Sequence, residues 1–305
     1  MTSAGVAPNK PRSNAVGGIF VMMAAVGLLA AMNGVIKLIG PEYNPAQVTF
    51  LRNIVATIVI VPFILKAGGI TTLRTRRPGM HAARALSGLL ANVFYFYAAP
   101  RLPLSDVMVI SQAVPLFVAV MAVVFLREVV GWRRWAAILA GFGGVLVTLE
   151  PTGEIHPAAL ATVAGTVCWA TTILLLRTLG RTESPYTVVF YYMVAGTVMS
   201  ALAQPWVWHT PPPDVMVLFV IAGIFGAFGQ LLMALALKMA EASVVSPFSY
   251  TAILWGIGFD VVIWHTAPDM ATLLGAAIIT LSGLYLLHRE NMKRKRGGAT
   301  PPAEN

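Results

Sequence analysis

The chain is a succession of ten long apolar blocks separated by short polar segments. Most blocks approach the roughly 20 apolar residues that an α-helix needs to cross the hydrocarbon core of a bilayer, and they are continuous rather than alternating. The pattern therefore predicts an all-α membrane protein with ten spans and short loops. The expected spans are residues 14–39, 45–66, 79–99, 103–126, 132–149, 157–179, 185–207, 214–238, 242–264 and 269–288.

The composition of the chain agrees with this pattern. Hydrophobic residues make up 57% and charged residues 11% of the 305 positions, which is typical of a polytopic membrane protein embedded in a lipid bilayer. The net charge of +9 could indicate nucleic-acid binding. However, the basic residues lie between the apolar blocks rather than on one continuous face, so no nucleic-acid partner is expected.

Both ends of the chain are polar. Residues 1–13 form a tail that carries Lys10 and Arg12, and the apolar run after it continues to about Ile39. That run is longer than the roughly 7–15 apolar residues of a signal peptide, so we expect a retained first span. Residues 289–305 form a second, basic tail.

The distribution of basic residues predicts the orientation. With a cytoplasmic N-terminus, all but three of the 21 Lys and Arg residues fall on the cytoplasmic side. The exceptions are Lys37 and Arg101 on the outer side and Arg52 within the second span. Because loops rich in Lys and Arg stay in the cytoplasm, we expect a multi-pass protein of the cell (inner) membrane with both termini cytoplasmic.

A weak internal repeat divides the spans into two sets of five. With an offset of 138 residues, Asn92 aligns with Gln230 and Ser111 with Ser249. Since each set has an odd number of spans, the second is expected to be inverted relative to the first. This arrangement is typical of secondary transporters, whose substrate site lies where the two repeats meet. The expected repeats are residues 14–150 and 151–288.

Three stretches resemble the EamA-type branch of the drug/metabolite transporter superfamily. The run from Ala113 to Leu149 has a mid-span Pro-Leu, a Glu at the end of the fourth span and a Gly-rich fifth span. QVTFLRNIVA from Gln47 and RPGMHAARALSGLLANVFYFYA from Arg77 resemble the second and third spans of the same branch. The chain departs from the family pattern near His265, where an acidic residue is expected at the end of the ninth span.

The resemblance implies alternating-access transport of a small organic metabolite through a central cavity. It favours a bulky heteroaromatic solute such as riboflavin or S-adenosylmethionine, with export of amino acids, metallophores or drugs as the alternative. A channel or a membrane scaffold is the further alternative, although no ring of charge or filter-like loop is visible. No enzyme activity, catalytic residue, metal or cofactor is expected, because the sequence contains no phosphate-binding loop, H-E-x-x-H motif or serine elbow.

Arg52 and Asp260 are the charged residues singled out for their position within a span. Arg52 lies seven residues into the second span, about 10 Å deep at ~1.5 Å per residue, where a lipid-facing arginine is costly. We expect it to face a polar cavity with Asp260 as its partner. The alternatives are that Arg52 snorkels to the interface and that Asp260 reaches water. Asp260 and Glu128 are candidates for coupling or gating, although an interfacial ion pair also explains Glu128.

Polar and aromatic residues within the spans are the candidates for binding substrate. Amides and hydroxyls in hydrocarbon either bond between helices or line a wet cavity, and aromatic rings can stack on a planar or cationic solute. Pro115 and Pro247 are suited to bending helices around such a cavity. The candidate cavity residues are Asn33, Arg52, Asn92, Tyr95, Ser111, Gln112, Trp169, Tyr192, Gln230, Ser249 and Tyr250.

Glycines gather in the fifth and tenth spans. They indicate close helix packing, either as a scaffold or as the contact of a homodimer, rather than cavity walls. The glycines are Gly141, Gly143, Gly144, Gly275 and Gly283.

Overall fold

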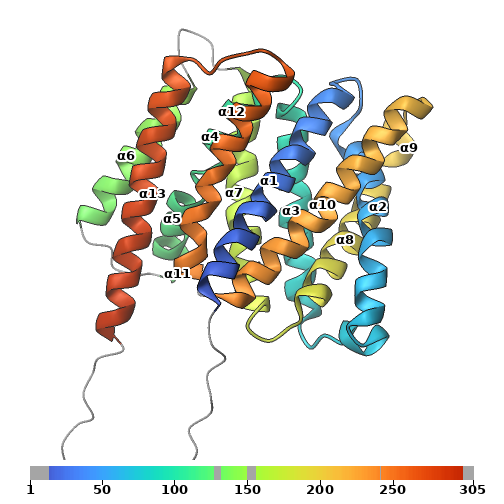
Figure 1. Ribbon diagram of the computed structural model, residues 1–305, viewed down its shortest axis with the longest axis horizontal. Coiled ribbons are helices and arrows are strands. Elements are labelled where there is room, and N and C mark those ends of the chain that lie inside the picture. Colours follow the sequence, from blue (N-terminus) through green and yellow to red (C-terminus); the bar gives the residue numbers. More distant parts are fainter. Residues whose placement is uncertain (1–13, 127–131, 150–155, 241, 298–305) are drawn as a thin grey trace, which may run out of the picture.

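The computed structural model describes residues 14–126, 132–149, 156–240 and 242–297 as a bundle of helices, without a β-strand among them (Figure 1). The first half contains α1 (Ala15–Ile39), α2 (Pro45–Lys66), the 3-10 helix η1 (Gly69–Leu73), α3 (Pro78–Ala98), α4 (Leu104–Ser111), α5 (Val114–Leu126) and α6 (Trp132–Thr148). The second half contains α7 (Pro157–Leu179), α8 (Pro185–Ala201), α9 (Gln204–Val207), α10 (Pro213–Met239), α11 (Ala242–Val245), the 3-10 helix η2 (Ser246–Tyr250), α12 (Thr251–Ile263) and α13 (Met270–Gly297).

Proline and asparagine define where several helices begin. Pro45 occupies the first turn of α2, and the Asn44 side chain accepts a hydrogen bond from the Ala46 N–H at 2.9 Å. Proline suits this position because the first N–H groups of a helix have no partner within the helix. Helix α1 ends at Gly40, whose φ of 95° a residue with a side chain rarely adopts.

Three of the spans expected to be continuous are interrupted. The span 185–207 divides near its end into α8 and α9, and the other two divide close to a proline. The span 103–126 divides into α4 and α5 just before Pro115, and the span 242–264 divides into α11, η2 and α12 around Pro247. A proline ring clashes with the carbonyl four residues earlier and cannot donate a helical hydrogen bond. These two proline-associated interruptions lie at corresponding places of the two halves, because the 138-residue offset aligns Gln112 with Tyr250.

Helices from the two halves pack against one another throughout the bundle. Helix α1 packs along α10 and α3 along α7, while α2 meets α8, α4 meets α12 and α6 meets α13. The pair α6 and α13 forms one flank and α2 with α8 forms the other, and α1 begins at the end of the bundle where α13 finishes (Figure 1). The space between these pairs is therefore bordered by both halves.

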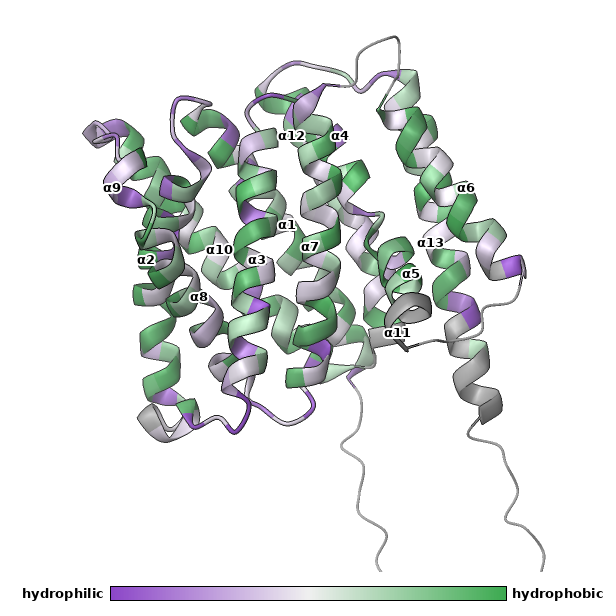
Figure 2. Ribbon diagram, turned by 180° about the vertical axis from the view of Figure 1, so that it is seen from behind, coloured by the Kyte–Doolittle hydropathy of each residue, from purple (hydrophilic) through white to green (hydrophobic). Residues whose placement is uncertain are grey.

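Most residues along the helices are apolar (Figure 2), and many large apolar side chains are exposed on the outside of the bundle. Leu254, Val262 and Leu281 are 70%, 72% and 69% exposed. Such exposed apolar side chains are suited to lipid rather than water. Seven helical segments among the described residues are long and apolar enough to cross a membrane. They are Ala15–Ile39, Pro45–Lys66, Leu104–Met121, Pro157–Leu179, Pro213–Met239, Ser246–Ile263 and Met270–Arg289.

The glycines of α6 and α13 make close contacts inside the chain. A Cβ atom on Gly144 would lie 2.9 Å from Ile278, and one on Gly275 would overlap the Thr148 hydroxyl. These glycines therefore let α6 and α13 approach each other closely, as expected for a scaffold.

Candidate functional site

A cavity of about 170 Å³ lies between the two halves of the chain. Its walls come from α1, α2, α3, α5, α7 and α10, from both proline-associated helix interruptions, and from Leu286 and Leu287 of α13. Most of the polar and aromatic residues singled out in the sequence lie in these walls. They are Asn33, Arg52, Asn92, Tyr95, Ser111, Gln112, Trp169, Gln230 and Ser249.

The two interruptions meet beside this cavity. The Ser249 hydroxyl oxygen lies 3.4 Å from Gln112 Oε1. The Ser111 hydroxyl donates to the Met108 carbonyl at 2.7 Å and that of Ser249 to the Ser246 carbonyl at 2.8 Å. Side chains thus satisfy some of the backbone groups that a broken helix leaves without partners. In a membrane protein, broken helices are tolerated where they line a cavity or are buried in protein.

Arg52 of α2 lines the cavity and is only 1% exposed. Its guanidinium carbon lies 5.1 Å from the centre of the Phe96 ring. Gly226 of α10 leaves room for it, since a Cβ atom there would lie 2.8 Å from Arg52 Nη1. The Nε atom of Arg52 has no hydrogen-bond partner in the described part of the chain. Arg52 therefore points into the bundle rather than toward the outer interface.

The expected pairing of Asp260 with Arg52 is wrong. Oδ1 of Asp260 lies 3.0 Å from Lys37 Nζ, and the carboxylate accepts the backbone N–H groups of Leu104 at 3.0 Å and Ser105 at 2.7 Å. The Ser105 hydroxyl donates to the same carboxylate at 2.8 Å. The N-terminus of α4 offers unpaired N–H groups and a partial positive charge, which attract a carboxylate. Sequence spacing could not reveal that α4 begins beside α12.

Tyr192 belongs to a buried polar cluster next to the cavity rather than to its lining. Its hydroxyl accepts a hydrogen bond from Asn92 Nδ2 at 3.1 Å and also interacts with Arg52. Its ring lies 4.3 Å from the guanidinium carbon of Arg84. Arg84 in turn donates to Gln230 Oε1 at 3.2 Å. Tyr192 and Arg84, which lie behind the cavity wall, thereby hold the wall amides of Asn92 and Gln230 in place.

Two other predicted residues lie elsewhere. Tyr250 is buried in an apolar cluster that includes Ile138 of α6 and Ile279 of α13, outside the cavity lining. Its large side chain fills the close approach that Gly283 permits. Glu128 lies outside the described residues.

Comparison with known protein families decides the identity of this architecture. The sequence profile of the EamA-like transporter family matches residues 16–150 and matches again over residues 156–288. The chain belongs to the EamA-like transporter family. It is therefore a multi-pass membrane transporter, and the resemblance noted in the sequence is confirmed.

Characterised relatives of this EamA-like transporter carry several different metabolites. An S-adenosylmethionine uptake transporter of Rickettsia bellii is 30% identical over 83% of this chain and 87% of its own length. A riboflavin transporter of Vibrio cholerae is 28% identical over 92% of this chain and 95% of its own length. A pseudopaline exporter of Pseudomonas aeruginosa is 24% identical over 88% of this chain and 95% of its own length. All three names describe transport of a small molecule.

A solved crystal structure has the same fold as this EamA-like transporter. It superposes with a TM-score of 0.63, covering 93% of this chain and 99% of the other, at 21% sequence identity. At that identity the likeness concerns the fold alone.

Sequence reasoning missed Arg84 of this transporter, which it counted only among the basic residues of the cytoplasmic side. Arg84 is on α3 and is 1% exposed. The missed signal is a set of residues that recur every four positions along α3, namely Arg84, Gly88, Asn92 and Phe96. Residues four apart share one face of a helix, so Arg84 had to face the same neighbours as Asn92.

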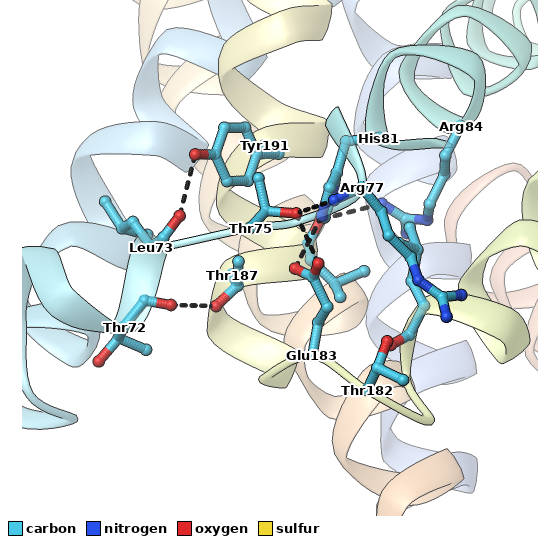
Figure 3. Close-up of polar contacts among 12 residues, drawn as sticks. Thr72, Leu73, Thr75, Arg77, His81, Arg84, Thr182, Glu183, Thr187 and Tyr191 are labelled. Carbon is cyan, nitrogen blue, oxygen red and sulfur yellow. Dashed lines mark hydrogen bonds and ion pairs between the residues drawn. The ribbon is translucent and has the colours of Figure 1, made fainter. Parts of the chain in front are cut away.

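A second polar cluster joins the two halves at the end of the bundle where α1 begins (Figure 3). Glu183, between α7 and α8, lies 2.9 Å from Nε2 of His81 and accepts the Thr75 hydroxyl at 2.5 Å. The Tyr191 hydroxyl donates to the Leu73 carbonyl at 2.9 Å. Burial by itself would raise the pKa of Glu183, but hydrogen bonds from Thr75 and His81 outweigh it and lower the pKa. The cluster therefore holds an ionised carboxylate at neutral pH.

Proposed function

We propose that this EamA-like transporter moves a small organic metabolite across the cytoplasmic membrane by alternating access. The observation that carries the proposal is the cavity between the halves, whose polar walls come from both halves and from both proline-associated helix interruptions. Secondary transporters build their substrate sites in this way, from discontinuous helices at a repeat interface. The nine lining residues that the sequence singled out are the proposed substrate contacts.

We propose further that ten helical segments cross the membrane as two inverted repeats of five. The packing order of the helices supports this arrangement. Helix α1, first in its half, packs on α10, third in the other half, and α3 packs reciprocally on α7. Helices α2, α4 and α6 pack on their counterparts α8, α12 and α13. A two-fold axis between the halves produces this exchange, and it lets the halves swap conformations.

Two ion pairs between the halves suit the gates that alternating access requires. With both termini cytoplasmic, as the basic loops predict, Lys37 and Asp260 close the outer end and His81 and Glu183 close the inner end. Opening toward one side then breaks one pair while the other remains. Proton or ion coupling through Asp260 is not part of this proposal, because its carboxylate is occupied by Lys37 and α4.

The relatives suggest a metabolite of the size of S-adenosylmethionine or riboflavin as substrate. Tyr95, Phe96 and Trp169 in the cavity wall offer aromatic faces to a planar ring. Export is the alternative direction, and the similarity to a pseudopaline exporter favours testing it.

The proposal is tested by counterflow in proteoliposomes that contain the purified full-length chain. We expect saturable exchange of a radiolabelled metabolite from a panel that includes S-adenosylmethionine, riboflavin and aromatic amino acids. Asn33→Leu should raise the half-saturation concentration about tenfold, because Asn33 Oδ1 has no partner among the described residues and the residue lines the cavity. Loss of one substrate hydrogen bond to an uncharged group gives an effect of roughly this order.

The matched control is Leu254→Ala, on the exposed apolar surface of α12. It should leave the half-saturation concentration unchanged. Flux that rises linearly with concentration would indicate a pore, and absence of exchange for the whole panel would contradict the proposal.

A further inference from the structure

The charge of the cavity lining has a single sign. Within the part of the chain that the structure describes, the lining contains Arg52 and Arg177 and no Asp or Glu. Arg84, next to the lining, is a further buried arginine. The described lining therefore offers guanidinium groups and no carboxylate to a solute.

The partners of Arg52 and Arg84 are neutral. Arg52 lies against the Phe96 ring and near the Tyr192 hydroxyl, while Arg84 binds the Gln230 amide oxygen and lies over the Tyr192 ring. Aromatic faces and amides stabilise a guanidinium only partly. A charge removed from water normally pairs with an opposite charge.

Two carboxylates that connect the halves are bound elsewhere than at Arg52 and Arg84. Asp260 is held by Lys37 and the N-terminus of α4, and Glu183 is held by His81 and Thr75. Both lie at the ends of the bundle rather than in the cavity lining. Arg52 lines the cavity, and its Nε atom is buried without a hydrogen-bond partner among the described residues.

We infer that the substrate carries a carboxylate that binds to Arg52, an inference that rests on the proposed transport function. The guanidinium fork pairs with a carboxylate through two parallel hydrogen bonds. Phe96 behind Arg52 and Gly226 beside it fix the position of the fork. The substrate carboxylate supplies, next to Arg52, the negative charge that the described cavity lining lacks.

This inference discriminates among the solutes carried by the relatives. S-adenosylmethionine has an amino-acid carboxylate, whereas riboflavin has no ionised group at neutral pH. The carboxylate end is placed at Arg52 on α2, and the ring of the substrate is placed against Trp169 on α7. A carboxylate-bearing aromatic or heteroaromatic metabolite is therefore the substrate class.

The test uses pairs of solutes that differ by one carboxylate. The pairs are L-tryptophan with tryptamine and S-adenosylmethionine with its decarboxylated form. Each is measured for thermal stabilisation of the purified full-length protein and for inhibition of counterflow. For at least one pair we expect the carboxylate member to act at a concentration at least tenfold lower. Arg52→Gln should remove that difference, weakening the carboxylate member at least tenfold and leaving the amine nearly unchanged.

Arg101→Gln is the matched control, because Arg101 lies over Tyr97 outside the cavity lining. It removes the same charge and should keep the tenfold preference. If Arg52→Gln does not fold, Arg52→Lys keeps the charge without the fork and should lose part of the preference, while a preference unchanged in Arg52→Lys would overturn the assignment.

The outcomes separate this inference from the proposed function. Saturable counterflow with equal potency within both pairs, or with riboflavin alone, would overturn the inference and leave transport standing. Preference for flavin mononucleotide over riboflavin, without preference within the two pairs, would assign a phosphate and overturn the carboxylate. Absence of saturable exchange for every solute would overturn both.

Discussion

Lys37 and Asp260 form an ion pair, with 3.0 Å between Nζ and Oδ1, that ties α1 to α12. The same carboxylate accepts two backbone N–H groups at the start of α4. One side chain of the second half thus holds two helices of the first half together. This arrangement gives Asp260 a structural role, and in the proposed mechanism the same contacts close the outer end of the bundle.

Removal of the Asp260 charge should therefore destabilise the protein. Asp260→Asn leaves the Lys37 ammonium without its partner and should lower the free energy of unfolding by roughly 2–4 kcal/mol. The measurement is thermal unfolding of the purified protein. Lys37→Met combined with Asp260→Asn should cost less than the sum of the single changes, because the two residues interact directly.

Asp214→Asn is the control for the Asp260 prediction. Asp214 is an exposed acidic residue in the first turn of α10, and its replacement should change the unfolding free energy by less than about 0.5 kcal/mol. Strict additivity of the Lys37 and Asp260 changes would contradict a pairwise interaction.

Gly88 should be intolerant of a side chain. A Cβ atom there would overlap Cε2 of Tyr192, and the Tyr192 ring cannot move without disturbing Asn92 and Arg84. We expect Gly88→Ala to lower the free energy of unfolding by about 1–3 kcal/mol and to impair counterflow. Gly79→Ala on the same helix has open space and should do neither. Equal stability of the two variants would show that Tyr192 relaxes freely.

The Glu183 cluster should make stability depend on pH at acid values. The pKa of Glu183 is lower when the protein is folded, so the unfolded chain binds the proton more tightly. Its stabilising contribution is complete above the ordinary carboxyl pKa of about 4.3 and is lost as the pH falls through the lowered folded value. Glu183→Gln should therefore reduce the melting temperature at pH 7 and have little effect in strong acid.

Glu42→Gln is the control for Glu183, because Glu42 is exposed in the loop after α1. Its melting temperature should match that of the unmodified protein across the pH range. A constant difference between Glu183→Gln and the unmodified protein, including in strong acid, would point to a packing effect instead of a titrating charge.

The proposed orientation can be tested in intact cells. In a Cys168→Ser background, a cysteine at Thr210 should react with a membrane-impermeant thiol reagent, whereas one at Arg74 should react only after the membrane is opened. Thr210 precedes α10 and Arg74 precedes α3, and the basic loop is expected inside. Labelling at Arg74 with protection at Thr210 would reverse the orientation.

The hydrophobic pattern by itself determined which segments of this chain become helices. Each of the ten expected ranges overlaps a helix or an interrupted helix, because a continuous run of about 20 apolar residues can satisfy its backbone in lipid only as a helix. Repeat-related amides such as Asn92 and Gln230 were also recognisable, since buried amides require partners or a cavity. Nine of the predicted cavity residues line one cavity for that reason.

Tertiary structure decided which charged residues meet. Asp260 pairs with Lys37, 223 positions away in the chain, because the packing of α1, α4 and α12 brings a carboxylate to a helix N-terminus. Arg84 is buried because its face of α3 lies against Tyr192 and Gln230. Charge pairing depends on distances of a few ångströms between helices. The sequence of one helix shows which of its residues share a face, but it does not show which helix packs against that face.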